Sequence, residues 1–384
     1  MLDLLLAHAA DDRQDDDLVR ALVAHEAALL RPARAADRSQ VREAETAVSR
    51  APAAAFSFDA SGSATLTAAG HSWRAGRFEP LSIGELRTRA ANASGEKRGR
   101  LRLWVLAGDN AATDIGHLQS QAGTGTLFQV ASQFNCLEAP WDELTSVARY
   151  FSDPTQGPRA SISAFPGTLL RHYRAPGPRG IPFVQTNNGP QIELLRDVCD
   201  PGVATVSNGY LRAANVAQPK ALSAILAERF DAIRVGVHDD VEVVRGYNWD
   251  GAVSGTPHIA QVFTSTLAAG HYGGAAGSLL DVCRQLLRAA YLGTLLAAFS
   301  LGRDRVVLTL IGGGAFGDPP RLIWEAILWA MLQVESLIAR DLDVVINGRN
   351  LGEQLDRPTI LAGVRAHGGV LITCPHGGPP SIHR

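Results

Sequence analysis

Apolar and polar residues alternate along this chain with two different periods. In residues 1–55, apolar side chains recur every three or four positions among charges, which predicts helix. Residues 56–80 alternate residue by residue around a turn at Ser61–Gly62, which predicts a β-hairpin. We therefore expect residues 1–100 to form a helical and β-hairpin appendage that ends in a polar, turn-rich linker at residues 92–100.

From residue 101 onward, short apolar runs alternate with helical patterns. Alternation of strands and helices is typical of a largely parallel sheet with helices on its faces. The sequence thus predicts an α/β fold in which residues 101–384 form one three-layer domain with a mixed, largely parallel central sheet. The predicted strands cover residues 101–106, 126–132, 232–237, 241–244, 259–264, 305–311 and, as the last, 342–346, and the predicted helices cover residues 160–173, 221–229, 279–301 and 319–338.

The sharpest chemical signal is the glycine-rich segment after the strand predicted at residues 305–311. Glycines let backbone N–H groups approach an anion closely, and the N-terminus of a following helix adds positive potential. Three consecutive glycines exceed what a tight strand-to-helix turn needs. We therefore predict a phosphate-binding site made by Gly312, Gly313, Gly314, Ala315, Phe316 and Gly317.

Other nucleotide-binding patterns fit this segment less well. Gly312, Gly314 and Gly317 have the GxGxxG spacing of dinucleotide-binding folds. That fold needs a further βαβ run with an acidic residue at the end of its second strand. Here the next predicted strand ends at Asn347–Gly348, and little chain follows it. The GxxxxGK[ST] phosphate loop does not occur in the sequence.

Three segments of the chain resemble the macrodomain superfamily, which binds ADP-ribose, with some similarity to its poly(ADP-ribose) glycohydrolase branch. Asp114–Ile115–Gly116 is similar to the family's G-D-I-T segment. Residues 128–135 are similar to the strand that ends in N-A-A-N, and residues 311–317 are similar to the late strand and its S-x-G-x-F-G loop. The order and spacing of the three segments agree with the family.

The resemblance implies a role for each segment. Asp114 would bind adenine, with Ile115 beside it in the same site. Asn135, or Gln133 in the same segment, would reach the distal ribose, and the glycine-rich segment would hold the diphosphate. The family's early glycine-rich loop and the paired glutamates of the glycohydrolase branch have no counterpart after Asn135.

Carboxylates follow the segment that resembles the ribose-binding strand. Cleavage of an ADP-ribosyl bond needs a polarised leaving group and an activated water, and carboxylates serve both tasks. Glu138 would project at the end of a parallel strand, where ligands bind in open α/β sheets; the alternative is a surface residue before the Pro140 turn. Residues 153–158 form a rigid turn that could replace the missing glycine loop, or an ordinary loop before a helix. We predict catalytic roles for Asn135, Glu138 and Asp153 and ligand contacts for Gln133, Thr155, Gln156 and Gly157.

Other polar residues are expected to have structural rather than functional roles. Adjacent residues in a strand point to opposite faces, so His238–Asp239–Asp240 is interpreted as a solvated hairpin turn rather than a metal or base site. His258, His271 and Tyr272 could reach the pocket, although a lone histidine is more often structural. Cys136 is expected to be buried and unreactive, because no histidine is placed to activate it.

Composition narrows the class of protein further. The formal net charge of −2 supplies no basic field for nucleic acid. The 4 cysteines lie far apart without a CxxC pair, which favours reduced thiols in the cytoplasm over disulfides or a zinc site. The longest apolar stretch, residues 289–302, falls short of the ~20 residues that a membrane span needs, and the first residues lack the basic region of a secretion signal.

Together these features predict a cytoplasmic ADP-ribosylhydrolase of macrodomain type. Its partner would be ADP-ribose or an ADP-ribosylated substrate, and no cofactor or metal is expected. A non-catalytic reader of ADP-ribose and a dinucleotide-dependent oxidoreductase remain the alternatives. A reader has no use for carboxylates near the anomeric carbon, where they are costly to desolvate, and this favours the hydrolase.

Overall fold

The computed structural model of the chain describes residues 38–93, 99–108, 113–140, 143–251, 253–270, 277–349, 351–375 and 380–384. Some expectations lie outside the described residues. They are the helical pattern before residue 38, residues 94–98 of the expected linker, and His271 with Tyr272.

Most predicted strands and helices are present within a residue or a few of their expected bounds. The strands are β1 Phe56–Phe58, β2 Ala64–Ala68, β3 His71–Ser82, β4 Leu101–Ala107, β5 Thr126–Ala131, β6 Leu211–Arg212, β7 Arg234–Glu242, β8 His258–Thr264, β9 Leu267–Ala268, β10 Arg305–Thr309, β11 Leu342–Gly348, β12 Leu371–Thr373 and β13 Ser381–His383. The helices are α3 Ser39–Arg50, α4 Pro52–Ala55, α5 Ile83–Ala93, α6 Ile115–Ser120, α7 Gln156–Ser163, α8 Phe165–Tyr173, α9 Pro219–Glu228, α10 Ser278–Ser300, α11 Pro320–Val334, α12 Leu351–Gln354 and α13 Arg357–Ala366.

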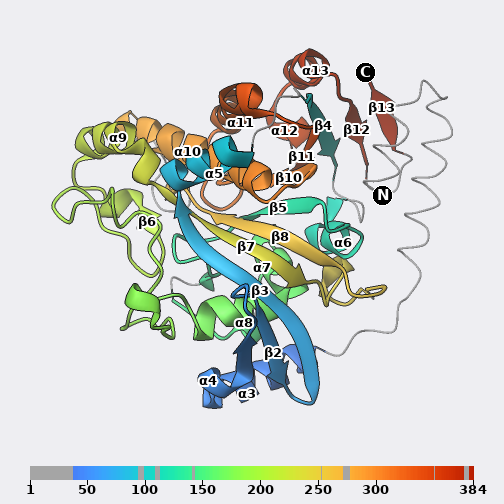
Figure 1. The fold of residues 1–384 in the computed structure, drawn as a ribbon. Coiled ribbons are helices and arrows are strands. Elements are labelled where there is room, and N and C mark those ends of the chain that lie inside the picture. Colours follow the sequence, from blue (N-terminus) through green and yellow to red (C-terminus); the bar gives the residue numbers. More distant parts are fainter. Residues whose placement is uncertain are drawn as a thin grey trace.

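A sheet of 11 strands runs through the molecule in the order β1-β2-β3-β7-β8-β5-β10-β11-β4-β12-β13 (Figure 1). From β8 to β12 in this order, neighbouring strands are parallel. The strands at both ends of the sheet pair in antiparallel fashion. The expected α/β class with a mixed, largely parallel central sheet is therefore confirmed.

Helices cover both faces of this sheet, which gives the three layers. Figure 1 shows α5, α9, α10 and α11 together on one face and α7 and α8 on the other. The central helix is α10, which is buried along nearly its whole length because apolar residues occupy almost every side of it. No described helix is both long and apolar enough to cross a membrane.

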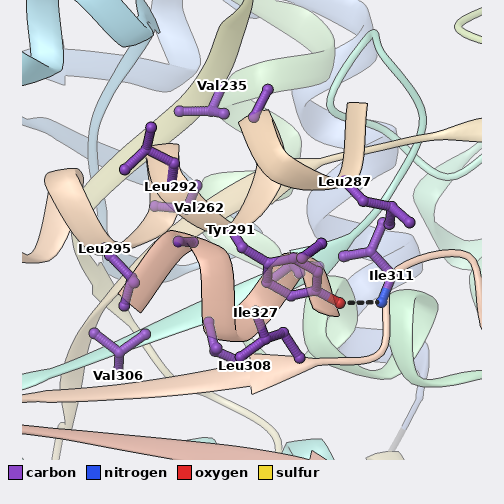
Figure 2. Packing of buried hydrophobic residues seen from close by; sticks show 14 of the residues in the cluster. Val235, Val262, Leu287, Tyr291, Leu292, Leu295, Val306, Leu308, Ile311 and Ile327 are labelled. Carbon is purple, nitrogen blue, oxygen red and sulfur yellow. Dashed lines mark hydrogen bonds between the residues drawn. The ribbon is translucent and has the colours of Figure 1, made fainter. Parts of the chain in front are cut away.

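The packing of α10 also fixes the end of β10. Tyr291 of α10 is fully buried, and its ring lies near Ile311, Ile327 and the strand residue Leu308 (Figure 2). Its hydroxyl donates to the Thr309 carbonyl at 3.0 Å and accepts the Ile311 N–H at 3.0 Å. A buried phenol needs such partners, and these two hold the chain where β10 ends and the glycine-rich segment begins.

The predicted hairpin turn at residues 238–240 is wrong, because β7 continues through it. The register with β8 shifts between His238 and Val241, and Asp240 adopts a φ of 59°. Opposite this bulge lies Gly76 with a φ of 77°; a β-carbon there would lie 2.2 Å from the Asp239 carbonyl oxygen. A β-bulge therefore accommodates these polar residues inside one strand.

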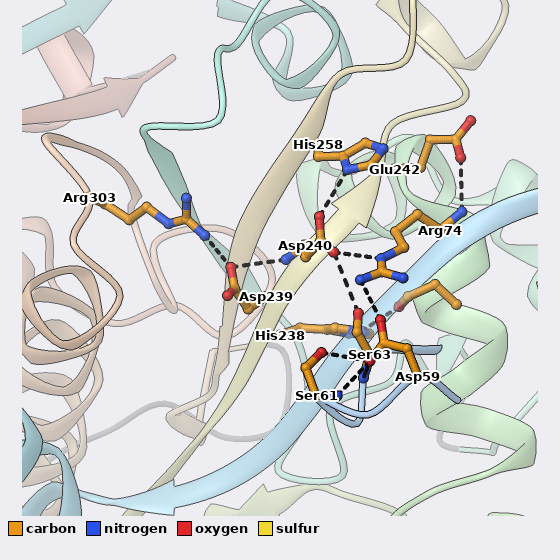
Figure 3. A network of polar contacts seen from close by, with 11 residues as sticks. Asp59, Ser61, Ser63, Arg74, His238, Asp239, Asp240, Glu242, His258 and Arg303 are labelled. Atoms are coloured by element: carbon orange, nitrogen blue, oxygen red, sulfur yellow. Dashed lines mark hydrogen bonds and ion pairs between the residues drawn. The ribbon is translucent and has the colours of Figure 1, made fainter. Parts of the chain in front are cut away.

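Partners from distant segments neutralise the charges of this bulge (Figure 3). Asp240 lies 2.5 Å from Arg74 Nε and 2.9 Å from His258 Nδ1, whereas Asp239 points the other way to pair with Arg303. Among the described residues there is no group of three or more side chains able to hold a metal ion. His258 is thus engaged at the bulge and does not line the cavity described below.

The strand predicted as the last is followed by two more. Both β12 and β13 span three residues each and pair at one edge of the sheet. Strands this short carry too few alternating positions to stand out from a loop in sequence. The helix predicted at residues 160–173 begins earlier and restarts near Pro166, as α7 and α8.

The segment expected to be an appendage shares the main sheet and core. β3 pairs with β7 from Arg77 opposite Asp239 to Ser82 opposite Arg234. The buried side chains Ile83, Leu86 and Ala90 place α5 in the same core cluster as α10. The division of the chain at residue 100 stays a prediction that fragments can test.

We expect a fragment of residues 101–384 to unfold at a much lower temperature than the whole chain. Its loss of β3 would expose the edge of β7, and its loss of α5 would expose apolar side chains of α10. Thermal unfolding followed by circular dichroism would measure the difference, with a fragment of residues 38–384 as the control. Equal melting temperatures for the two fragments would show that residues 38–100 do not stabilise the rest of the fold, as expected of an appendage.

Candidate functional site

A cavity of about 370 Å³ opens at the carboxyl ends of β5, β8, β10 and β11. Ligands in open α/β sheets bind at this edge, because the loops after parallel strands converge there. The first turn of α7 forms part of the wall. The sequence-predicted site residues that line the cavity are Gln133, Glu138, Thr155, Gln156, Gly157, Gly312, Gly313, Gly314, Ala315 and Phe316.

Glycine is required at two positions of the loop between β10 and α11. Gly312 and Gly317 have φ values of 75° and 73°, in the left-handed region that side chains disfavour. A β-carbon at Gly312 would lie 2.2 Å from Asp318 Oδ2, and one at Gly317 would lie 2.5 Å from the Cα of Gly270. Gly317 contacts this neighbouring backbone without lining the cavity itself.

The glycine-rich loop offers unused hydrogen-bond donors. The Asp318 N–H closes it on the Gly312 carbonyl at 3.0 Å, so its backbone is held in one shape. Free backbone amides gathered in a concave loop form an anion site. Within the part of the chain that the structure describes, no acceptor takes the N–H groups of Gly312, Gly314, Ala315 and Phe316.

A buried carboxyl group lies beneath this loop. Asp318 is 2% exposed, and it is close to the Cys283 thiol of α10 and the Thr266 hydroxyl. Burial raises the pKa of Asp318 to about 6, an effect that the thiol and the hydroxyl oppose. At neutral pH the Asp318 carboxyl group is therefore ionised, and its burial in this form destabilises the folded protein.

This raised pKa predicts a pH-dependent effect of Asp318→Asn on stability. The folded pKa of about 6 exceeds the ordinary value of 3.8, so the contribution of Asp318 to stability is greatest below pH 3.8 and is lost as the pH rises through 6. The loss amounts to about 3 kcal/mol. Asn does not ionise, so the variant is expected to exceed wild type in unfolding free energy at pH 7.5 and to approach it near pH ~4.

Urea unfolding at both pH values would measure this difference. Asp281→Asn, at an exposed carboxyl in the first turn of α10, is the matched control and should not exceed wild type in unfolding free energy at pH 7.5, because Asp281 is paired with Arg284. An Asp318→Asn variant that is no more stable than wild type at pH 7.5 would contradict the burial of an ionised carboxylate.

Glu138 lies in the wall that follows β5. Its side chain is 6% exposed, and no donor among the described residues reaches Oε1. Burial raises the pKa of Glu138 well above its ordinary range, and the charge of Asp153 raises it further, whereas Arg171 and a hydrogen bond from Gln133 lower it. Burial therefore favours the protonated form of the Glu138 carboxyl group.

The first turn of α7 packs directly against Glu138. A β-carbon at Gly157 would lie 2.4 Å from the Ala131 carbonyl oxygen and 2.8 Å from Glu138 Oε1. Gly157, for which a ligand contact was predicted, is thus also needed for the packing of α7. Only glycine lets this helix reach the end of β5 and the carboxyl group together.

Gln133 and Asn135, the two candidates for the ribose contact, differ in position. Gln133 lines the cavity, and its Nε2 donates to the Tyr210 hydroxyl at 3.2 Å. Asn135 is fully buried, donates to Gln191 Oε1 at 3.1 Å and accepts the Leu137 N–H at 3.1 Å. Asn135 is absent from the cavity wall because these contacts turn its amide into the protein.

Asp153 and Gln156 stabilise the turn before α7. Asp153 accepts the Thr155 N–H at 2.9 Å, and Gln156 Oε1 accepts the Ile115 N–H at 2.9 Å. Thr155 and Gln156 line the cavity, whereas Asp153 lies behind them. Gln156 therefore connects the cavity wall to the first turn of α6.

Asp114 caps α6 and is fully engaged by protein groups. Its Oδ1 accepts the His117 N–H at 3.0 Å and the Asn248 N–H at 3.3 Å, and Oδ2 pairs with Arg159. Neither Asp114 nor Ile115 lines the cavity. The role in adenine binding implied by the resemblance stays a prediction for this segment.

Sequence reasoning missed the residues at the end of β11. Asn347 and Arg349 line the cavity, as does Gln354. Asn347 Nδ2 donates to the Thr113 carbonyl at 3.0 Å, while its buried Oδ1 has no donor among the described residues. Burial lowers the pKa of the Arg349 guanidinium. The available signal was a pair of polar residues directly after a buried strand.

No protein-family model matches this chain, and no curated protein matches its sequence. Among solved structures, it is similar to poly(ADP-ribose) glycohydrolase from Thermomonospora curvata, with 16% identity, 85% of this chain and 98% of the other covered, and a TM-score of 0.41. It is also similar to the Deinococcus radiodurans enzyme in complex with ADP-ribose, with 13% identity, coverage of 76% and 93%, and a TM-score of 0.42. At such values, function has to be inferred from the cavity itself.

Proposed function

We propose that this protein is an ADP-ribosylhydrolase of macrodomain type, which binds ADP-ribose and cleaves it from a modified target. One observation carries the proposal. The free amides of the glycine-rich loop and the buried acid Glu138 line the same cavity. The free amides could bind a diphosphate, and Glu138 could transfer a proton to a leaving group.

The arrangement of the strands supports one orientation of ADP-ribose. The loop after β10 would hold the diphosphate in the middle, because β10 lies between β5 and β11 in the sheet. The distal ribose would then lie toward Gln133 and Glu138, after β5. The adenosine would lie toward Asn347 and Arg349, after β11, where both side chains contact Thr113 next to the predicted adenine-binding segment.

In this orientation Glu138 acts as the general acid. Its raised pKa favours the protonated form, and the proton passes to the leaving atom as the bond to the anomeric carbon breaks. Water oriented by the ligand's own phosphate then attacks the anomeric carbon, and the proton that it loses passes to the Glu138 carboxylate, which restores the acid. Asp153 does not line the cavity and acts only through its charge near Glu138. Gln133 would hold the ribose hydroxyls and align the bond; Asn135 would support the loop that carries both residues.

Two measurements on the whole chain test this proposal. Titration calorimetry with ADP-ribose and with NAD should show binding of ADP-ribose; no heat from either ligand would end the proposal. Release of ADP-ribose from proteins modified on Arg, Glu or Ser side chains should occur for at least one linkage. Tight binding without release would indicate a reader, whereas preference for NAD with nicotinamide-linked redox chemistry would indicate an oxidoreductase.

A further inference from the structure

Arg171 of α8 is a fully buried side chain, and its hydrogen-bond partners among the described residues are all uncharged. Nε donates to the Cys136 carbonyl at 3.0 Å, and Nη2 donates to the Thr168 hydroxyl at 3.1 Å. Nη1 lies 2.7 Å from His238 Nδ1, and the guanidinium stacks 3.6 Å from the centre of the Phe263 ring. A buried cation without a paired anion lowers the stability of the fold. We therefore expect this charge to serve a function.

The partner His238 is held in its neutral form. Its Nε2 lies 2.7 Å from the Ala75 carbonyl oxygen, which accepts a hydrogen bond and so requires a proton on Nε2. Nδ1 is then free to accept from Arg171. Burial and the Arg171 charge both lower the pKa of His238 well below its ordinary value. The neutral ring accepts a hydrogen bond from Arg171, and the positive charge stays on the Arg171 guanidinium.

The contacts of Arg171 lead to the loop that carries Glu138. Cys136 has a φ of 61°, an unfavourable backbone conformation for a residue with a side chain, and its carbonyl is the one that Arg171 holds. Glu138 follows two residues later and lines the cavity. The positive charge of Arg171 also lowers the pKa of the Glu138 carboxyl group.

We propose that Arg171 is a positioning residue that holds the Cys136–Glu138 loop in shape and supplies a fixed positive charge behind the Glu138 carboxyl group. This inference rests on the hydrolase function proposed above. The groups that face Glu138 are Arg171 from α8, Tyr150 from the 3-10 helix Val147–Ser152, Asp153 after it and Gln133 from the same loop. Of these, Arg171 and the hydrogen bond from Gln133 favour the ionised carboxylate, whereas burial and Asp153 oppose it.

The first test measures the pKa of Glu138 without any need for activity. Protein labelled with 13C at the glutamate carboxyl carbons is titrated by NMR, and Glu138→Gln identifies the signal. The neutral replacements Arg171→Met and Arg171→Gln should raise the pKa of Glu138 by about one unit, because a nearby opposite charge is lost. Arg171→Lys keeps the charge and should leave the pKa within a few tenths of a unit.

Two variants control this titration. Arg174→Met removes a positive charge just after α8, where the guanidinium lies over the Phe58 ring, and it should leave the Glu138 signal unmoved. Asp153→Asn should shift the pKa of Glu138 downward, opposite to the Arg171 variants. A folded Arg171→Met or Arg171→Gln protein with an unchanged Glu138 pKa would overturn the proposal.

The second test uses the release of ADP-ribose. In the neutral variants, the limb of the pH–rate profile that reports Glu138 should move to higher pH. In Arg171→Lys the limb should stay, while kcat falls about ten-fold because lysine lacks the Nε–H that donates to the Cys136 carbonyl. If the neutral variants do not fold, an unchanged kcat in Arg171→Lys overturns the proposal. If wild type releases no ADP-ribose, the hydrolase proposal fails, and the NMR titration still decides the role of Arg171.

Discussion

Replacing Glu138 with glutamine is expected to lower the rate of ADP-ribose release by about 10² to 10⁴, the usual contribution of a positioned general acid. The affinity for ADP-ribose should stay within about three-fold of wild type. The reason is that burial raises the pKa of Glu138 and so favours its uncharged form. An amide of the same shape therefore preserves packing and charge, and only the transferable proton is lost.

Single-turnover release of ADP-ribose measures the rate, and calorimetry with free ADP-ribose measures the affinity. Glu143→Gln, at an exposed glutamate further along the same segment, is the matched control and should behave as wild type. Release at the wild-type rate by Glu138→Gln would exclude Glu138 as the acid. Loss of release together with loss of binding would instead assign Glu138 to ligand recognition.

The glycine-rich loop could be located from sequence because its signal is local. A buried apolar strand, a run of glycines and a proline-initiated helix are adjacent in the chain, and each has a direct physical reading. Parallel strands then place the loop after residue 309 beside the segment after residue 131, since the carboxyl ends of parallel strands share one edge. The proximity of Glu138 to the glycines follows from that topology.

The roles of Gln133 and Asn135 could not be separated in this way. Their segment is a loop whose shape depends on distant backbone groups: Phe134 donates to the Gly209 carbonyl at 2.8 Å and accepts the Leu194 N–H at 3.0 Å. These bonds and the left-handed Cys136 decide which amide faces the cavity. No periodicity within the segment itself encodes that choice.

The strand β7 illustrates the same limit. Its polar residues at positions 239 and 240 are typical of a turn when read alone. Arg74 and Arg303 supply the opposite charges that let the strand continue, and His258 adds a hydrogen-bonding partner. Asn347 and Arg349 were missed for a related reason, because their relevance depends on β11 lying next to β10.

Gly314→Val is expected to leave the fold intact and to weaken ADP-ribose binding by about 100-fold. A β-carbon at Gly314 would meet no atom within 4 Å, so the substitution causes no clash within the protein. Gly314 lines the cavity, however, and a branched side chain there would keep a diphosphate away from the free amides of the loop. Loss of two charge-assisted hydrogen bonds costs about 3 kcal/mol, which corresponds to the stated factor.

Calorimetry would measure the affinity, and thermal unfolding should show a melting temperature within about 3 °C of wild type. Gly123→Val is the matched control, because Gly123 is exposed, lies outside the cavity and also leaves space for a β-carbon. Gly312→Ala should behave differently from both, since a β-carbon there meets the buried Asp318 carboxylate and the melting temperature should fall together with the affinity. Wild-type affinity in a folded Gly314→Val protein would mean that the diphosphate does not bind on this loop, and the orientation of ADP-ribose proposed above would fail with it.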